Sequence, residues 1–296
     1  MKDRQTRLFL LWAFVLAWLC QAGAIVLARS GQVQGFQLVL MLSMFAPFAA
    51  VLLARIPLGG MGWRPRLRRK GKWFAAAWLG AAVLSALGGL LYFLVFPAQL
   101  DLSGGAYAAQ LGEAGMAQLE AQGLTVQKAI AVQIAAALTG APFLNLLPSL
   151  GEEAGWRGAL YPRLKARFGT GKGRVLGGLI WGVWHWPVIL LAGYNYGTAY
   201  WGAPVLGALL FCVMTVALGT LFDLLYEKTG CIWIPALAHG AFNACAGAPV
   251  LFQQPGWERF SLLGPGPIGL VGGLPLLILA ALVLRKPEEQ ETGPAL

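Results

Sequence analysis

The sequence predicts an all-α membrane protein with about eight transmembrane helices, and three observations support this prediction. The 296 residues are 58% hydrophobic and only 11% charged, whereas soluble domains carry about 25% charged residues. The apolar residues form long runs, and a helix needs about 20 of them to cross a bilayer. The basic residues lie between these runs, so membrane topology explains the net charge of +10 better than a nucleic-acid surface does. We therefore expect a single polytopic domain over residues 1–296 in the cell membrane, with lipid around it and no nucleic-acid partner.

Eight apolar runs are candidate spans. The first follows Lys2, Arg4 and Arg7 in the manner of a signal peptide. It exceeds the roughly 7 to 15 residues of a signal core, so we expect a retained helix. The predicted spans cover residues 8–27, 36–54, 73–96, 126–147, 175–192, 204–226, 231–252 and 262–284.

The basic residues predict the orientation of the chain. If the N-terminus is cytoplasmic, 19 of the 22 Lys and Arg residues fall on the inner side, and only Arg29, Lys128 and Arg259 fall outside. Loops that carry most of the Lys and Arg usually face the cytoplasm. We therefore expect both termini to be cytoplasmic and Arg68 to be reached only from the inside.

The informative residues are ionisable groups in or beside the spans, because such a group at mid-membrane costs at least about 2.5 to 3.5 kcal/mol. His185 lies ten residues into the fifth span and His239 lies eight residues into the seventh, which runs in the same direction. At the rise of an α-helix, both histidines should lie roughly 12 to 15 Å below the cytoplasmic face. The predicted catalytic core covers roughly residues 126–252, and its polar clusters are Glu152 with Glu153 and Arg157, then His185, then His239 with Asn243.

The two carboxylates reach this depth only if the fourth span is bent. Pro142 and Pro148 can break that helix. Ser149 would then cap a new helix, with Glu152 three residues later completing a capping box. We therefore expect a bend ahead of the carboxylates.

Helical spacing separates the roles of the two carboxylates. Glu153 and Arg157 are four residues apart and share a helix face, so we expect an ion pair. Glu152 points about 100° away from that face and is free to act as a base. His239 and Asn243 are also four residues apart and share a face.

Other conspicuous residues are expected to serve structure. Asp223 and Glu227 close the sixth span beside Lys228, where we expect a solvated helix end. Residues 97–125, with Asp101, Glu113 and Glu120, are expected to form an outer loop with a short interfacial helix. Small residues four apart let backbones approach, and cysteines in apolar runs act as small hydrophobes. These residues are Gly173, Gly177, Gly178 and Gly182, and Cys20, Cys212, Cys231 and Cys245.

The three polar clusters together resemble the CPBP family of CAAX prenyl-protein endopeptidases and bacteriocin-processing or Abi proteins. The family pattern is EExxxR, then FxxxH, then HxxxN or HxxxD, on separate membrane helices. The matching residues here are Glu152, Glu153 and Arg157, then His185, then His239 and Asn243. Trp181 stands at the phenylalanine position of the second motif. The resemblance spans residues 148–243 and implies an intramembrane peptidase that acts on a peptide or protein substrate, with CAAX-type C-terminal processing of a lipidated substrate as one form.

The mechanism expected from these residues begins at Glu152. This carboxylate, assisted by His185, would take a proton from a water that attacks the scissile carbonyl. His239 and Asn243 would donate hydrogen bonds to the oxyanion. Glu153 and Arg157 would orient the site. No serine or cysteine is placed as a covalent nucleophile.

Three alternatives stay open at the level of sequence. Two histidines and a glutamate would satisfy a three-ligand zinc site, although the histidines are 54 residues apart and no HExxH is present. A non-catalytic immunity or scaffold protein would keep the fold and tolerate loss of Glu152. A secondary transporter would also hold ionisable residues at mid-membrane, but it should show paired repeats, and none is evident.

Overall fold

The computed structural model describes residues 2–65, 70–256 and 258–285, and within these ranges the chain is helical and forms no strand. An isolated antiparallel bridge joins Leu100 to Gln253. The predicted all-α class is therefore confirmed. The α-helices are α1 (Lys2–Arg29), α2 (Val33–Ser43), α3 (Ala46–Leu53), α4 (Gly71–Val95), α5 (Gly105–Ala121), α6 (Val126–Leu138), α7 (Ala141–Leu144), α8 (Leu146–Gly155), α9 (Tyr161–Phe168), α10 (Thr170–Trp184), α11 (Trp186–Ala192), α12 (Val205–Thr229), α13 (Trp233–Cys245) and α14 (Leu274–Leu284).

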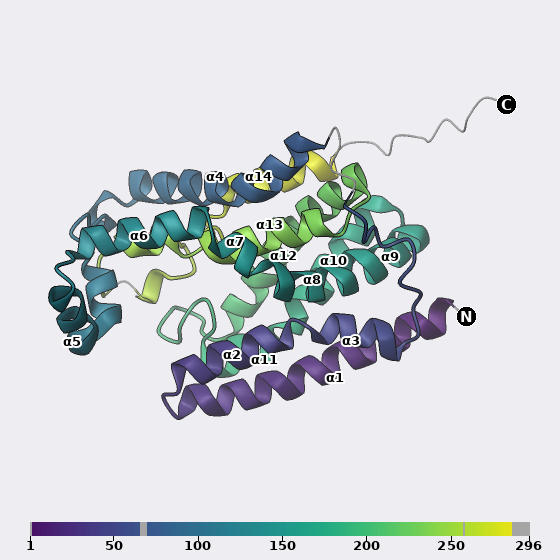
Figure 1. Ribbon diagram of the computed structural model, residues 1–296, viewed down its shortest axis with the longest axis horizontal. Coiled ribbons are helices and arrows are strands. Elements are labelled where there is room, and N and C mark those ends of the chain that lie inside the picture. Colours follow the sequence, from purple (N-terminus) through teal and green to yellow (C-terminus); the bar gives the residue numbers. More distant parts are fainter. Residues whose placement is uncertain (1, 66–69, 257, 286–296) are drawn as a thin grey trace.

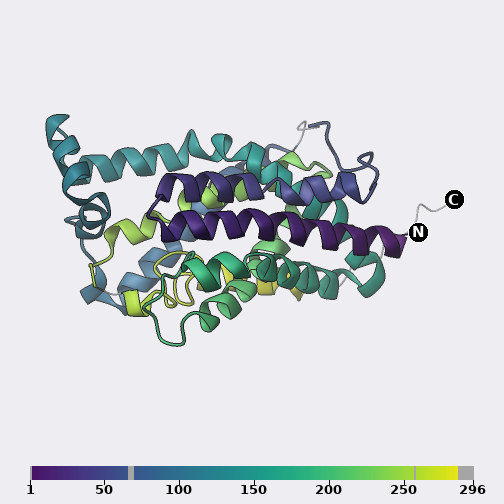
Figure 2. The same ribbon diagram turned by 90° about the horizontal axis from the view of Figure 1, so that it is seen from below.

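The helices form an elongated bundle (Figure 1). The long α1 runs along one side with α2 and α3 packed beside it, as both views show (Figure 2). Helices α4 and α14 lie on the opposite side in Figure 1, and α8, α10, α12 and α13 lie between these two layers. The central helices carry the predicted catalytic residues Glu152, Glu153 and His239, while Arg157 lies in the turn that follows α8 and His185 lies between α10 and α11.

Five of the eight predicted spans are confirmed as helices long and apolar enough to cross a membrane: Asp3–Arg29, Val33–Leu53, Gly71–Val95, Val205–Thr229 and Trp233–Phe252. Thr170–Trp184 and Trp186–Ala192 form a sixth if this pair, bent by 41°, is one span. The other two predicted spans contain the shorter apolar helices Val126–Leu138 and Leu274–Leu284. The count of eight is not confirmed, because backbone breaks divide the predicted fourth span and leave α14 only 11 residues long.

The loops predicted to share the inner side gather at one end of the bundle. Arg167 pairs with Asp3, and the Gln5 side chain donates to the carbonyl of Arg55. Lys70 donates to the carbonyl of Thr229 in the same region. Helix α5, in the predicted outer loop, lies at the opposite end (Figure 1). The cytoplasmic placement of the basic end remains a prediction, and Arg66, Arg68, Arg69 and Lys286 lie outside the described residues.

The predicted close packing by glycine is confirmed between α10 and α12. A Cβ on Gly178 would meet the backbone of Val216, and one on Gly182 would lie 2.7 Å from the Cys212 sulfur. The Thr215 hydroxyl donates to the Gly178 carbonyl at 2.9 Å across the same contact. Three of the cysteines are buried as predicted, and Cys20 is half-buried.

The fourth span is broken as predicted, but the details differ. Helix α6 ends at Leu138, α7 covers Ala141–Leu144, and α8 begins at Leu146. Ser149 therefore lies inside α8, and its buried hydroxyl has no hydrogen-bond partner in the described part of the chain. The predicted capping box with Glu152 is wrong, because α8 starts three residues before Ser149.

The predicted solvated end of the sixth span is also wrong. Asp223 is fully buried and binds Lys165 at 2.8 Å and Arg174 at 2.8 Å. Glu227, which is partly exposed, binds the same two cations at 2.6 Å each. Lys165 of α9 and Arg174 of α10 therefore both pair with the two carboxylates of α12 and link the three helices.

Candidate active site

The α8 carboxylates face different surroundings, as their spacing predicted. Glu153 is fully buried, and its Oε1 accepts from Arg157 Nη1 at 3.0 Å. Glu152 is 2% exposed. Its Oε2 accepts from the indole N–H of Trp156 at 3.0 Å and from that of Trp181 at 2.7 Å. Glu153 therefore belongs to an ion pair, whereas Glu152 is held by neutral donors.

Arg157 lies in a π-helical turn, Trp156–Leu160, between α8 and α9. Pro162 follows in the first turn of α9, and a proline there would clash with a regular α-helical carbonyl four residues earlier. The wider turn accommodates this proline. The Arg157 guanidinium is enclosed by aromatic rings, 4.7 Å from Tyr161, 4.8 Å from Trp181 and 5.2 Å from Phe222. This cage fixes Arg157 against Glu153.

His185 lies at a break in the predicted fifth span. It follows the last residue of α10, Trp184, and Pro187 lies in the first turn of α11, so the chain bends by 41° at this point. The sequence interpretation treated residues 175–192 as one helix and missed the break, although Pro187 signals it. His185 Nδ1 lies 2.9 Å from the carbonyl oxygen of Trp181. A carbonyl can only accept, so Nδ1 carries the proton and Nε2 holds a lone pair in the neutral ring.

His239 projects from α13 onto the ion pair. Its Nδ1 lies 2.9 Å from Glu153 Oε1, the oxygen that also binds Arg157. Its ring stacks on Phe222 with centroids 5.6 Å apart. Because Glu153 is ionised in its pair with Arg157, Nδ1 donates to it, and Nε2 carries a proton only when the ring is cationic.

The predicted residues converge on one cavity of about 800 Å³, which Glu152, His185, His239 and Asn243 all line. Asn243 is exposed on the cavity wall. Glu153 and Arg157 do not line it and lie behind Glu152 and His239. The structure thus brings the three sequence clusters together in two layers, one facing the cavity and one supporting it.

Sequence reasoning missed several polar groups of the same cavity. Asn145, at the start of α8, lines the cavity and donates to the Gly240 carbonyl at 3.3 Å. Tyr194, after α11, also lines it. Burial raises the pKa of Tyr194, and the negative charge of Glu152 raises it further, so the phenol remains a neutral donor. Neither residue belongs to a recognisable motif, and only the breaks after α7 and α11 place them at the cavity.

The donor atoms do not form a three-ligand metal site. Among the described residues, no group of three or more His, Cys, Asp or Glu side chains is arranged to hold a metal ion. Glu152 Oε2 accepts two indole protons and Nδ1 of both histidines is engaged, whereas the described residues make no hydrogen bond to Glu152 Oε1 or to Nε2 of either histidine. A histidine that binds a metal through Nε2 commonly has Nδ1 hydrogen-bonded in this way, so zinc stays an alternative that elemental analysis tests.

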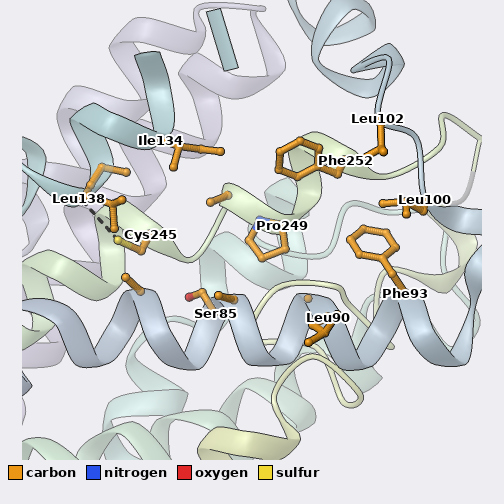
Figure 3. Close-up of a pocket in the computed structure, with 15 residues that line it drawn as sticks. Ser85, Leu90, Phe93, Leu100, Leu102, Ile134, Leu138, Cys245, Pro249 and Phe252 are labelled. Carbon is orange, nitrogen blue, oxygen red and sulfur yellow. Dashed lines mark hydrogen bonds between the residues drawn. The ribbon is translucent and has the colours of Figure 1, made fainter. Parts of the chain in front are cut away.

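A second cavity of about 370 Å³ lies between α4, α6 and the segment after α13. Figure 3 shows Leu90 and Phe93 of α4 facing Ile134 of α6 and Phe252 across it. Its lining is aliphatic and aromatic apart from Ser85 and Cys245, the latter donating to the Ala137 carbonyl at 3.3 Å. This cavity has none of the polar groups of the first.

Comparison with known proteins gives two matches. A sequence model described as "Type II CAAX prenyl endopeptidase Rce1-like" matches residues 130–245. A curated relative, "CAAX prenyl protease 2" of Methanococcus maripaludis, is 40% identical over 55 residues, which are 18% of this chain. The aligned segment spans 20% of that relative's length. The match to the sequence model contains all six predicted site residues, and over residues 130–245 this chain is similar to the Rce1-like CAAX prenyl endopeptidases.

Proposed function

We propose that this protein is an intramembrane endopeptidase that hydrolyses a peptide bond in the cavity lined by Glu152, His185, His239 and Asn243. The observation that supports this proposal most strongly is the meeting of these side chains in one cavity of about 800 Å³. They come from α8, the α10–α11 break and α13, and they supply a base, its partner and donors. The matched family description names endopeptidases.

In the proposed reaction, water is the nucleophile. Glu152 accepts a proton as the water oxygen attacks the scissile carbonyl carbon, and the unprotonated Nε2 of His185 orients that water. The carbonyl oxygen becomes an oxyanion, which His239 and Asn243 stabilise. When the tetrahedral intermediate collapses, the carbon–nitrogen bond breaks and the proton held by Glu152 passes to the leaving amine.

The hydrogen bond between His239 and Glu153 determines when His239 can donate to the oxyanion. Nδ1 is committed to Glu153, so His239 donates to the oxyanion from Nε2 only as an imidazolium. The Glu153 carboxylate lies 2.9 Å from the ring and stabilises that positive charge. The buried second layer therefore supports the charge that the oxyanion requires.

The substrate class we propose is a lipidated protein C-terminus of the CAAX type. The name of the curated relative and the description of the family model both contain the words "CAAX prenyl". A membrane-embedded site suits a substrate whose lipid anchors it beside the cavity. Soluble peptides without a lipid are expected to be poorer substrates.

The decisive test compares wild type with Glu152→Gln in detergent or lipid vesicles, using a farnesylated peptide that ends in a CAAX sequence. The amide keeps the shape of the carboxylate but cannot accept the water proton. We expect cleavage to be abolished while the melting temperature is retained. A stable, active Glu152→Gln protein would exclude this base, and a wild type that cleaves nothing would favour the immunity or scaffold alternative.

The proposed reaction uses no metal ion, and elemental analysis of the protein tests this. We expect purified, active protein to contain less than stoichiometric zinc and to keep its activity in chelator. Stoichiometric zinc that is lost together with activity, and restored with it, would overturn the proposed metal-free mechanism.

A further inference from the structure

We propose that Trp156 and Trp181 position the catalytic base: their two indole N–H groups hold Oε2 of Glu152 and leave Oε1 for the attacking water. This inference rests on the proposed peptidase function. Neither tryptophan is assigned a role by the motifs, and the phenylalanine of the second motif could not donate.

The geometry of the carboxylate is the first support. Two indole N–H groups donate to Oε2 of Glu152. The Trp156 indole, four residues after Glu152, lies at 3.0 Å, and the Trp181 indole on α10 lies at 2.7 Å. An ionised carboxylate has about four acceptor positions, two on each oxygen. Both positions on Oε2 are therefore occupied, and no described residue donates to Oε1. Of the two oxygens, Oε1 is the one free to receive a proton.

The rigidity of the two donors is the second support. Trp156 is fully buried and packs edge-on against Phe9 at 5.9 Å and Trp184 at 6.1 Å. Trp181 is 3% exposed, and its ring contacts the Arg157 guanidinium at 4.8 Å and, edge-on, the His239 ring at 5.3 Å. The last side-chain torsion of a glutamate is otherwise broad. Two fixed donors on one oxygen restrict it to one orientation.

Trp181 also connects the base to its partner. Its indole N–H binds Glu152, and its carbonyl binds His185 Nδ1 at 2.9 Å. A single residue therefore fixes the Glu152 carboxylate and the His185 tautomer relative to each other. Trp181 acts through these two groups, so it is a positioning residue.

The expected effect of removing an indole donor follows from the form of Glu152 that the donor stabilises. An indole N–H favours the ionised carboxylate, so its loss makes Glu152 protonate at higher pH and leaves the carboxylate free to rotate. For Trp181→Phe and Trp156→Phe we expect kcat to fall about 10-fold with KM changed less than about twofold. The acid-side midpoint of the kcat/KM profile should rise by about one pH unit.

Other charges surround Glu152 and must stay constant in this comparison. Glu153 and Arg157 lie behind it, and His185 and His239 line the same cavity. Neither Trp→Phe substitution removes a formal charge. The matched control is Trp78→Phe, because the Trp78 indole donates at 2.8 Å to the Leu138 carbonyl and lines neither cavity.

The experiment has one readout in activity and one independent of it. Infrared difference spectra against Glu152→Gln identify the carbonyl band of protonated Glu152 and the pH at which it appears. We expect this pH to be higher in both Trp156→Phe and Trp181→Phe than in wild type and unchanged in Trp78→Phe. Trp156→Phe and Trp181→Phe both keep an aromatic ring. If only one of the two variants folds, that variant is enough for the test. An unshifted band together with an unchanged kcat, or the same shifts in Trp78→Phe, would overturn the inference. If no peptide is cleaved, the infrared band alone still decides whether the indoles hold Glu152.

Discussion

At the scale of single residues, Arg157 shows how the supporting layer of the site is stabilised. It is fully buried, and its Nε and Nη2 atoms have no hydrogen-bond partner among the described residues. Its charge is balanced by Glu153 at 3.0 Å and by the faces of three aromatic rings. Removing one partner of a buried ion pair costs about 3 to 5 kcal/mol, because the other charge stays buried without compensation.

Glu153→Gln should therefore lower stability, unlike Glu152→Gln. We expect a clear fall in melting temperature in detergent, matching a loss of about 3 to 5 kcal/mol. The control is Glu227→Gln, because Glu227 is partly exposed and its cations keep Asp223. That variant should lose much less. A Glu153→Gln protein with the melting temperature of wild type would show that the rings alone stabilise Arg157.

The sequence predicted side-chain contacts correctly where the two residues are close together in the chain. The pairing of Glu153 with Arg157 follows from helical spacing and is confirmed at 3.0 Å. The contacts of Glu152 with Trp181 and of Glu153 with His239 join residues 29 and 86 positions apart. Such contacts depend on how helices pack, which no local pattern specifies. The burial of Asp223 was mispredicted for the same reason, since its cations come from α9 and α10.

At the scale of elements, α10 is the helix on which the site depends most. It carries Trp181, leads into His185 and packs on α12 through glycine. Backbone contact between the two helices leaves no room for a side chain at Gly178. The position of α10 therefore controls how the base and its partner meet.

Gly178→Ala should separate α10 from α12. The added Cβ would meet the Val216 backbone, which cannot move aside as a side chain can. We expect a loss of about 1 to 3 kcal/mol in stability and reduced cleavage, because Trp181 and His185 move with the helix. Gly171→Ala is the control in the same helix, since its Cβ would meet nothing within 4 Å. It should be neutral or stabilising, as alanine suits helices better than glycine. Equal stability of both variants would contradict the close-packing role.

Element-scale prediction was limited by backbone breaks. Apolar runs located the helices, and the small-residue spacing identified the packing face of α10. Proline predicts the bend before α8, and Pro187 marks the break after α10 that the single predicted span 175–192 does not contain. The start of α8 was misplaced at Ser149, because a serine in a capping pattern can equally lie inside a helix. The π-helical turn at Trp156–Leu160 has no local signature beyond the proline that follows it.

At the scale of the whole molecule, sidedness follows from the distribution of basic residues. The described inner-loop residues meet at one end, through Arg167 with Asp3 and Gln5 with Arg55. Helix α5 occupies the other end (Figure 1). The structure therefore separates two ends as the sequence predicted, and from the positive-inside rule we expect the basic end to face the cytoplasm.

Cysteine labelling tests this assignment with two exposed positions. Arg64 lies at the basic end and Glu120 in α5 at the other, and both side chains are exposed. In intact cells, a membrane-impermeant maleimide should label Glu120→Cys and leave Arg64→Cys unlabelled until the cells are opened. Wild type is the control for the natural cysteines, three of which are buried and one half-buried. The reverse labelling pattern would show that the basic loops lie outside the cell. Glu152 and both histidines would then lie nearer to the outer face of the membrane. The labelling result therefore decides from which side of the membrane a substrate reaches the site.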